Sequence, residues 1–196
     1  MSAGAEEDAG RRLPPGPHGI SPDLVARNQR ERLVAAVAEA CAEDGYAETS
    51  VADLARRAGV STATFYKLFP GKRECVLEAH GELLARLLEE VDRACAAVEA
   101  GEPGVRAGVS TALALLAADP PTARLLTVEV LALGAAGIER NDAAIEAVAQ
   151  RLNARWSTVA GASMLIGKLV VTGEPASVLD LEDELVALAG SSRRVP

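Results

Sequence analysis

Residues 30–79 read RERLVAAVAEACAEDGYAETSVADLARRAGVSTATFYKLFPGKRECVLEA. This stretch decides the fold, because its apolar residues and chain breakers outline three helices in succession. In the first, apolar residues recur at spacings of three and four, which predicts an amphipathic helix over about 24–44: Leu33, Val34, Val37, Ala40 and Cys41. Gly45 then offers a natural stop, because glycine readily takes the left-handed conformation that ends many helices.

Two shorter helices are predicted after this stop. Ser50 is expected to cap one of them, with Asp53 three residues further on. Ser61 is expected to cap the other, which ends before Phe69-Pro70-Gly71. The two are joined by a turn of about four residues centred on Gly59, which is the geometry of a helix-turn-helix.

Small and polar side chains are predicted on the outer face of the third helix. Four apolar residues of the second helix, the turn and the third helix are expected to pin the turn to the core: Leu54, Ala55, Val60 and Phe65. The outward positions are then Ser61, Thr62, Ala63, Thr64 and Lys67. Short side chains can approach base edges in a major groove. Ser61 is equally suited to a capping role, and Thr64 to a plain surface role.

Groups able to meet DNA phosphates are predicted around this helix. A hydroxyl, a helix N-terminus or a positive charge can hold a phosphate and so position a protein on a duplex. The candidates are Ser50, Tyr66, Lys67 and Lys72.

The stretch strongly resembles the DNA-binding domain of the TetR family of transcriptional regulators. The matching features occur in order: Arg30, Leu33, Ala35-Ala36, Gly45-Tyr46, Thr49-Ser50, Leu54-Ala55, Ala58-Gly59-Val60-Ser61, Phe65-Tyr66, Phe69-Pro70 and Lys72. The resemblance implies an all-α fold of about nine helices, with an N-terminal three-helix helix-turn-helix domain and a C-terminal helical domain for ligand binding and dimerisation. It also implies that the third helix enters the major groove. On that basis the DNA contacts are Thr62, Ala63, Tyr66, Lys67 and Lys72.

Proline, glycine and apolar periodicity predict the domain boundaries, and the resemblance implies the role of each domain. Residues 1–22 form a disordered arm, 23–71 the helix-turn-helix domain, 72–190 the regulatory and dimerisation domain, and 191–196 a disordered tail. Further helices are expected at about 72–100, 104–118, 121–134, 140–154, 157–172 and 177–189.

Composition agrees with an all-helical chain, because 39 of the 196 residues are alanine and only 3% are aromatic. A formal net charge of −8, taken over the whole chain, argues against nucleic acid as a partner. However, residues 27–73 carry eight bases and six acids, a net of +2, whereas residues 74–196 carry ten bases and eighteen acids, a net of −8. We therefore expect weak, salt-dependent binding to non-specific DNA, with specificity resting on a dimer.

Several function classes find no support in the sequence. Two histidines and no recognisable cofactor motif argue against a catalytic site, a metal site or a cofactor. The chain has no apolar run of membrane-spanning length and no secretory signal at its start. Its three cysteines are expected to be reduced thiols. These features predict a cytoplasmic protein without a membrane partner.

A small-molecule pocket is expected among the later helices. Its candidate lining residues, each of which could also be plain core, are Leu84, Leu87, Leu88, Leu113, Leu116, Leu126, Val130, Trp156 and Met164. Glu129, within the apolar run LLTVEVLAL, could meet a ligand there. Exposure to solvent is favoured for it, because an unpartnered buried carboxylate is costly.

A homodimer surface is expected on the helices at 157–172 and 177–189. Its candidates are small residues and an apolar stripe, which could instead pack within one subunit: Gly161, Gly167, Val178, Leu181, Leu185 and Leu188.

Three functions compete at this stage. The leading hypothesis is a bacterial repressor that a small-molecule ligand releases from a palindromic operator in double-stranded DNA. The first alternative is a DNA-binding regulator of the same fold that is controlled by a protein partner or acts without a small ligand. The second is an all-helical enzyme or carrier.

Overall fold

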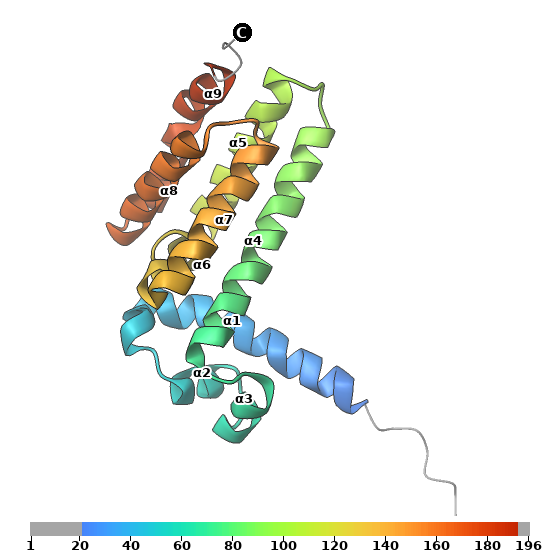
Figure 1. Cartoon of the computed structure of the whole chain (residues 1–196), viewed down its shortest axis with the longest axis vertical. Helices are drawn as coiled ribbons and strands as arrows, with labels where there is room; N and C mark the ends of the chain where they lie inside the picture. Colours follow the sequence, from blue (N-terminus) through green and yellow to red (C-terminus); the bar gives the residue numbers. More distant parts are fainter. Residues whose placement is uncertain (1–20, 192–196) are drawn as a thin grey trace, which may run out of the picture.

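The computed structural model describes residues 21–191, and within that range it is built of helices without strands. Helices α1 (Pro22–Glu48), α2 (Val51–Arg57) and α3 (Thr62–Leu68) form a small module at one end of the molecule (Figure 1). Helix α4 (Lys72–Ala96) leaves this module and runs the length of a larger bundle. The predicted all-α class with an N-terminal helix-turn-helix is confirmed.

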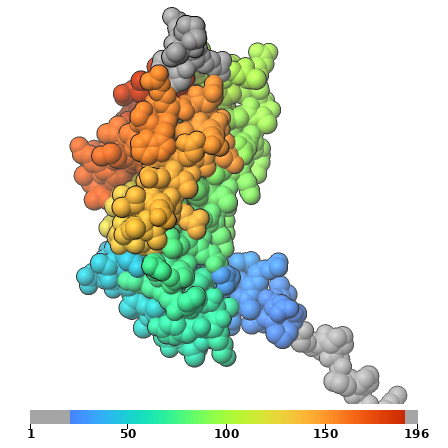
Figure 2. Space-filling model, viewed as in Figure 1, coloured from blue at the N-terminus to red at the C-terminus, as the bar shows by residue number. Residues whose placement is uncertain are grey.

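The bundle lies above the module in the space-filling view, and the two pack against each other (Figure 2). Its elements after α4 are α5 (Glu102–Ala118), α6 (Pro120–Thr127), the 3-10 helix η1 (Glu129–Leu133), α7 (Ala135–Arg151), α8 (Trp156–Val171), the 3-10 helix η2 (Pro175–Leu181) and α9 (Glu182–Ser191).

Four predicted helices differ clearly from the observed ones. The helix expected to run to residue 100 ends at Ala96, and the one expected at 121–134 divides into α6 and η1. Helix α7 begins at Ala135, earlier than predicted, directly after Gly134 with its φ of 71°. The last predicted helix divides into η2 and α9, so its apolar stripe does not lie on one continuous helix.

The predicted arm and tail fall mostly outside the described residues. Where they overlap, Ser21 caps α1 by accepting from the Asp23 N–H at 3.3 Å, Pro22 begins that helix, and Ser191 ends α9. A serine hydroxyl at this position replaces one of the hydrogen bonds that a helix start leaves unmade.

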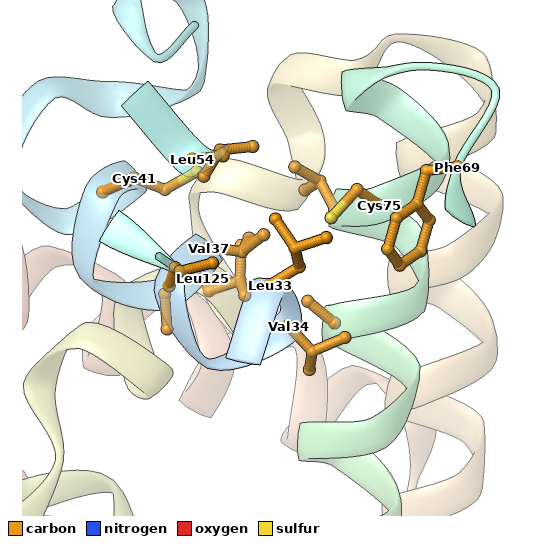
Figure 3. Close-up of a cluster of buried hydrophobic side chains, with 14 of the residues drawn as sticks. Leu33, Val34, Val37, Cys41, Leu54, Phe69, Cys75 and Leu125 are labelled. Atoms are coloured by element: carbon orange, nitrogen blue, oxygen red, sulfur yellow. The ribbon is translucent and has the colours of Figure 1, made fainter. Parts of the chain in front are cut away.

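A first apolar cluster holds the module together and extends beyond it (Figure 3). Leu33, Leu54 and Phe65 from α1, α2 and α3 are fully buried in it. Leu125 of α6 joins the same cluster, so the module packs directly on the bundle. The cluster thus contains residues from both sides of residue 72, where the boundary between the two domains is predicted. That boundary stays a prediction.

Two thiols lie inside this first cluster. Burial raises the pKa of Cys41 to about 11 and that of Cys75 to about 12, because an apolar surrounding disfavours the thiolate. Both side chains are fully buried and both cysteines are free.

Candidate nucleic-acid interface and buried cavity

The turn between α2 and α3 is fixed by local hydrogen bonds. Gly59 has a φ of 63°, a left-handed conformation that suits glycine, and the Val60 N–H donates to the Ala55 carbonyl at 2.9 Å. Ser50 accepts from the Asp53 N–H at 3.1 Å, and Ser61 accepts from the Thr64 N–H at 3.0 Å. Both predicted capping bonds are therefore present, and they set where each helix begins.

Helix α3 buries one face and exposes the other. Phe65 is fully buried, and its ring lies 5.5 Å from that of Tyr66 and 5.6 Å from that of Phe69. The exposed side chains are Ser61, Thr62, Ala63, Tyr66 and Lys67. Thr64 is only partly exposed, with its hydroxyl 3.0 Å from that of Ser61. The outer face is thus small and polar, as a helix that enters a major groove requires.

Arg30 fastens α3 to the helices on either side. Its guanidinium forms an ion pair with Glu78 of α4, donates to the Leu68 carbonyl at 3.0 Å and lies 4.4 Å from the centre of the Phe69 ring. These contacts join α1, the end of α3 and α4. Sequence reasoning used Arg30 only as a mark of resemblance, because its partners are distant in the chain.

Lys72, which was predicted to meet a DNA phosphate, binds the end of α1 in the structure. Its ammonium donates to the carbonyls of Tyr46 and Thr49, each at 2.7 Å, and to that of Ala47 at 3.3 Å. It also lies 4.2 Å from the centre of the Tyr46 ring. An ammonium has three N–H donors, so Lys72 is occupied in capping the end of α1. A phosphate contact by Lys72 would require exchanging one of these bonds.

Much of the positive charge on the module is internally paired. Arg57 contacts Asp53 at 2.7 Å and Glu43 at 2.6 Å, and the hydrogen bonds from Arg57 lower the pKa of both carboxyl groups. By contrast, Lys67 is exposed and forms no ion pair with any other residue of the described range. Lys67 is therefore the base on α3 that is free to meet a phosphate.

The bundle contains a cavity of about 110 Å³. Five of the predicted lining residues do line it: Leu84, Leu87, Leu113, Leu116 and Leu126. Its polar lining comes from four side chains that sequence reasoning did not select: Thr127, Asn141, Thr158 and Ser163. None of the lining residues, all within residues 21–191, is charged or aromatic.

The other four predicted lining residues lie elsewhere. Leu88 is buried but does not reach the cavity, and Val130 is buried in the first apolar cluster. Trp156 begins α8 and is 45% exposed, and Met164 is 77% exposed on the outer face of the same helix. Helical periodicity predicts that an apolar side chain faces inward. The packing of neighbouring helices decides whether that side chain lines the cavity, fills the core or lies at the surface.

The predicted dimer residues divide between the surface and the interior. Gly161 has open space where a Cβ would lie, whereas a Cβ on Gly167 would lie 2.9 Å from Val128 Cγ2. Val178 is fully buried and Leu185 lines the cavity, so both serve their own subunit. Leu181 is partly buried against the core, and Leu188 is 43% exposed. The surface of α8 instead presents Met164, Leu165 and Val171, at 77%, 46% and 53% exposure.

Glu129 is buried, contrary to the expectation that it faces solvent. Its carboxylate accepts from Arg124 Nε at 2.8 Å and from the Tyr46 N–H at 2.7 Å, and its side chain is 8% exposed. Arg124 also donates to the Ala42 carbonyl at 2.8 Å. Partners supplied by α1 and α6 thus offset the desolvation that made exposure the favoured prediction.

His80 of α4 is a second buried polar residue. It is fully buried, and neither ring nitrogen makes a hydrogen bond of good geometry within the described residues, although the nearby Leu126 backbone slightly favours the charged ring. Burial, together with the positive charge of Arg140, lowers the pKa of His80 to about 4. The imidazole is therefore neutral at pH 7.

The described range holds neither a membrane-spanning helix nor a metal-binding cluster. No helix in residues 21–191 is long and apolar enough to span a membrane. The same residues hold no group of three or more histidine, cysteine or acidic side chains arranged to bind a metal ion.

Comparisons with known proteins agree with this geometry. The family model "Bacterial regulatory proteins, tetR family" matches residues 33–79. The HTH-type transcriptional regulator EthR of Mycolicibacterium smegmatis is 32% identical over 110 residues, which are 55% of this chain and 51% of that protein. The chain thus aligns with about half the length of this relative.

Solved structures share the fold over most of the chain. FadR from Bacillus subtilis, in complex with stearoyl-CoA, superposes with a TM-score of 0.70 at 16% identity, covering 83% of this chain and 98% of that one. The fatty acid degradation regulator FadR from Bacillus halodurans has a TM-score of 0.64 at 16% identity, covering 86% and 97%. Residues 33–79, from within α1 to the first part of α4, thus match the TetR family of bacterial regulatory proteins, and the fold around them is the one these solved structures share.

Proposed function

We propose that this protein is a transcriptional repressor that binds a palindromic DNA operator as a homodimer and is released by a small apolar ligand. The observation that carries the proposal is the exposed face of α3, where Thr62, Ala63 and Lys67 stand outward while Phe65 anchors the helix in the core. On this assignment Thr62 and Ala63 read bases, and Lys67 and Tyr66 hold phosphates. Acting on DNA, the protein would work in the bacterial cytoplasm.

A homodimer is proposed because one module is a weak DNA ligand on its own. Internal pairing of bases such as Arg57 leaves little net charge to attract phosphates. Two α3 helices about 34–36 Å apart would read two half-sites on the same face of the duplex. The exposed apolar residues of α8, Met164, Leu165 and Val171, support that helix as the place where the two subunits meet.

Control by a ligand is proposed from the cavity. An engineered cavity of about 150 Å³ with apolar walls admits benzene, so a void of about 110 Å³ is of a size to hold a small organic molecule. Its lack of charged lining favours a neutral ligand that is mostly aliphatic, with a hydrogen-bonding group near Asn141 or Ser163. Stearoyl-CoA, named with the Bacillus subtilis neighbour, shares the aliphatic part of this description. The cavity also favours this proposal over control by a protein partner.

The test is selection of bound sequences from random duplex DNA, followed by binding measurements on variants. We expect a palindrome, and we expect Lys67→Ala to weaken binding to all sequences while lowering the salt slope by about one unit. Thr62→Ala should instead change the preference among operators. Arg155→Ala, which removes an exposed base at the start of α8, is the matched control and should leave both properties unchanged.

Two outcomes would contradict the proposal. One is a Lys67→Ala/Lys72→Ala double variant that is folded and binds the selected DNA as well as the original chain does. The other is recovery of sequences without a repeated half-site, which would remove the dimeric mode of binding.

A further inference from the structure

The C-terminal part of α1 is interrupted, and the interruption is held from two sides. Gly45 has φ 79° and ψ 157°, which are not helical angles, although helical turns continue on both sides of it. A continuous helix would join the Tyr46 N–H to the Ala42 carbonyl four residues earlier. Here the Tyr46 N–H donates to Glu129 at 2.7 Å, and the Ala42 carbonyl accepts from Arg124 at 2.8 Å.

The Arg124–Glu129 ion pair therefore takes the place of the backbone hydrogen bond that a continuous α1 would form between Tyr46 and Ala42. Glu129 provides the acceptor and Arg124 the donor for the two groups that flank the break, and the pair is closed by its own 2.8 Å contact. Charge-assisted hydrogen bonds of this kind are roughly twice as strong as neutral ones. An interaction between residues 83 positions apart thus fixes the local shape of a helix in the DNA-binding module.

The residues that follow the break in α1 are held by the DNA-binding module itself. Tyr46 accepts at its carbonyl from Lys72, the first residue of α4, and Lys72 also binds the Thr49 carbonyl directly before the cap of α2. Tyr46 is thus bound by the bundle at its N–H and by the module at its C=O. A shift of Glu129 would therefore move Tyr46 and, through Lys72, the starts of α2 and α4, which lie on either side of α3 in the sequence.

The segment that carries the ion pair is also part of the cavity wall. Leu126 and Thr127 lie between Arg124 and Glu129 in sequence and line the cavity. The next residue, Val128, is pressed against α8, where a Cβ on Gly167 would lie 2.9 Å from it. The segment therefore has little room to yield toward α8, so a ligand that displaces it would move the ion pair relative to α1.

We propose that Glu129 is a positioning residue that makes the DNA-binding module sensitive to occupancy of the cavity, by holding the break in α1 through Arg124 and the Tyr46 N–H. The proposal rests on the function proposed above and adds a route by which the ligand acts. Its central claim is that ligand binding and DNA release are separable: without the ion pair, the cavity still fills but the module no longer responds.

The experiment uses the full chain with 1-octanol as the cavity probe and the selected operator as the DNA. The variants are Glu129→Ala, which removes both contacts, and Glu129→Gln, which keeps a neutral acceptor for the Tyr46 N–H. Arg151→Gln is the control, because it breaks an ion pair of 3.0 Å with Asp92 in the bundle without touching α1. Thermal unfolding identifies any variant that fails to fold, and Glu129→Gln is the milder change if Glu129→Ala does so.

The first readout is amide hydrogen exchange in peptides covering residues 42–49, without ligand or DNA. We expect exchange to rise at least tenfold in Glu129→Ala, to rise less in Glu129→Gln, and to stay unchanged in Arg151→Gln. Unchanged exchange in a folded Glu129→Ala variant overturns the claim that the ion pair holds the break.

The second readout is the effect of 1-octanol on operator affinity. In the original chain and in Arg151→Gln we expect octanol to weaken operator binding about tenfold. In Glu129→Gln we expect octanol to bind within threefold of its original affinity while weakening operator binding less than twofold. Full release in that variant overturns the proposal. If octanol binds the original chain without releasing the operator, ligand control itself has failed, and the transmitting role of Glu129 fails with it.

Discussion

The two apolar clusters of this protein differ in how completely they are filled. In the cluster around α1, α2 and α3, Leu33, Leu54 and Phe65 are fully buried against one another. In the cluster of the bundle, the helices leave a cavity of about 110 Å³ between them. Close packing gives a surface helix one fixed position, whereas a void leaves room for a second molecule. The first cluster therefore suits a rigid recognition surface, and the second suits a site that responds to a ligand.

The largest expected effect comes from removing a leucine in each cluster. We expect Leu54→Ala to lower the free energy of unfolding by about 4 kcal/mol, because the fully buried side chain leaves a new void. Leu113→Ala should cost less, about 2–3 kcal/mol, because Leu113 already faces a cavity and loses fewer contacts. Urea denaturation of both variants measures the difference. Equal losses would contradict the contrast between the clusters.

His80 gives the next largest effect, through pH. Its pKa is about 4 in the folded protein against an ordinary value of 6.5, so the unfolded chain binds the proton first as the pH falls. Stability is thus fully present above pH 6.5 and decreases toward pH 4. The expected loss is about 3 kcal/mol, at about 1.4 kcal/mol for each pKa unit.

The measurement is the free energy of unfolding between pH 7 and pH 4 for the original chain and for His80→Leu, which cannot take up the proton. The carboxyl groups titrate in both proteins, so the difference between the two curves reports His80. Parallel curves would show that the folded protein accommodates the charged imidazole.

A smaller effect on stability is expected from substituting two glycines of α8, one on its inner face and one on its outer face. Gly167→Ala should lower stability by about 1–3 kcal/mol, because its Cβ would lie 2.9 Å from Val128 Cγ2. Gly161→Ala meets nothing within 4 Å and should raise the stability of the subunit by up to about 1 kcal/mol through helix propensity. Thermal unfolding gives both values. A Gly161→Ala variant with weaker dimerisation in sedimentation would place that glycine at the subunit contact, while a stabilising Gly167→Ala would contradict the tight packing.

The smallest expected effect is the change in ligand affinity for each methylene group added to the ligand. Neutral alcohols from butanol to decanol should bind about fourfold more tightly for each added methylene, because burying one contributes about 0.8 kcal/mol. The increase should stop once the cavity is full, and calorimetry would locate that length. Decanoate, which carries a charge, should bind more weakly than decanol because no basic side chain lines the cavity within the described residues. Tighter binding of decanoate would sink the assignment to neutral ligands.

Local signals made the module predictable from sequence. The caps at Ser50 and Ser61 and the turn at Gly59 depend on residues within a few positions, so their spacing alone indicates the structure. The cavity was only partly predictable. Periodicity indicates that Leu113 and Val130 both face inward, but the packing of α1 against η1 decides that Val130 fills a core while Leu113 lines a void.

Long-range polar contacts were beyond sequence reasoning. The burial of Glu129 depends on a backbone N–H that becomes available because α1 breaks at Gly45, 84 positions earlier. Lys72 was expected to face DNA because its charge was known and its partners, three carbonyls more than twenty positions earlier, were not. In both cases the residue type was informative and the identity of its neighbours was missing.

The buried thiols have a practical consequence for studying this protein. Cys41 and Cys75, with pKa values of about 11 and about 12, stay protonated at the pH used for maleimide labelling, and burial also raises the pKa of Cys95. A cysteine introduced at the exposed Ala63 would react first, with the native cysteines left in place. A fluorophore at that site would make α3, the helix proposed to enter the major groove, directly observable.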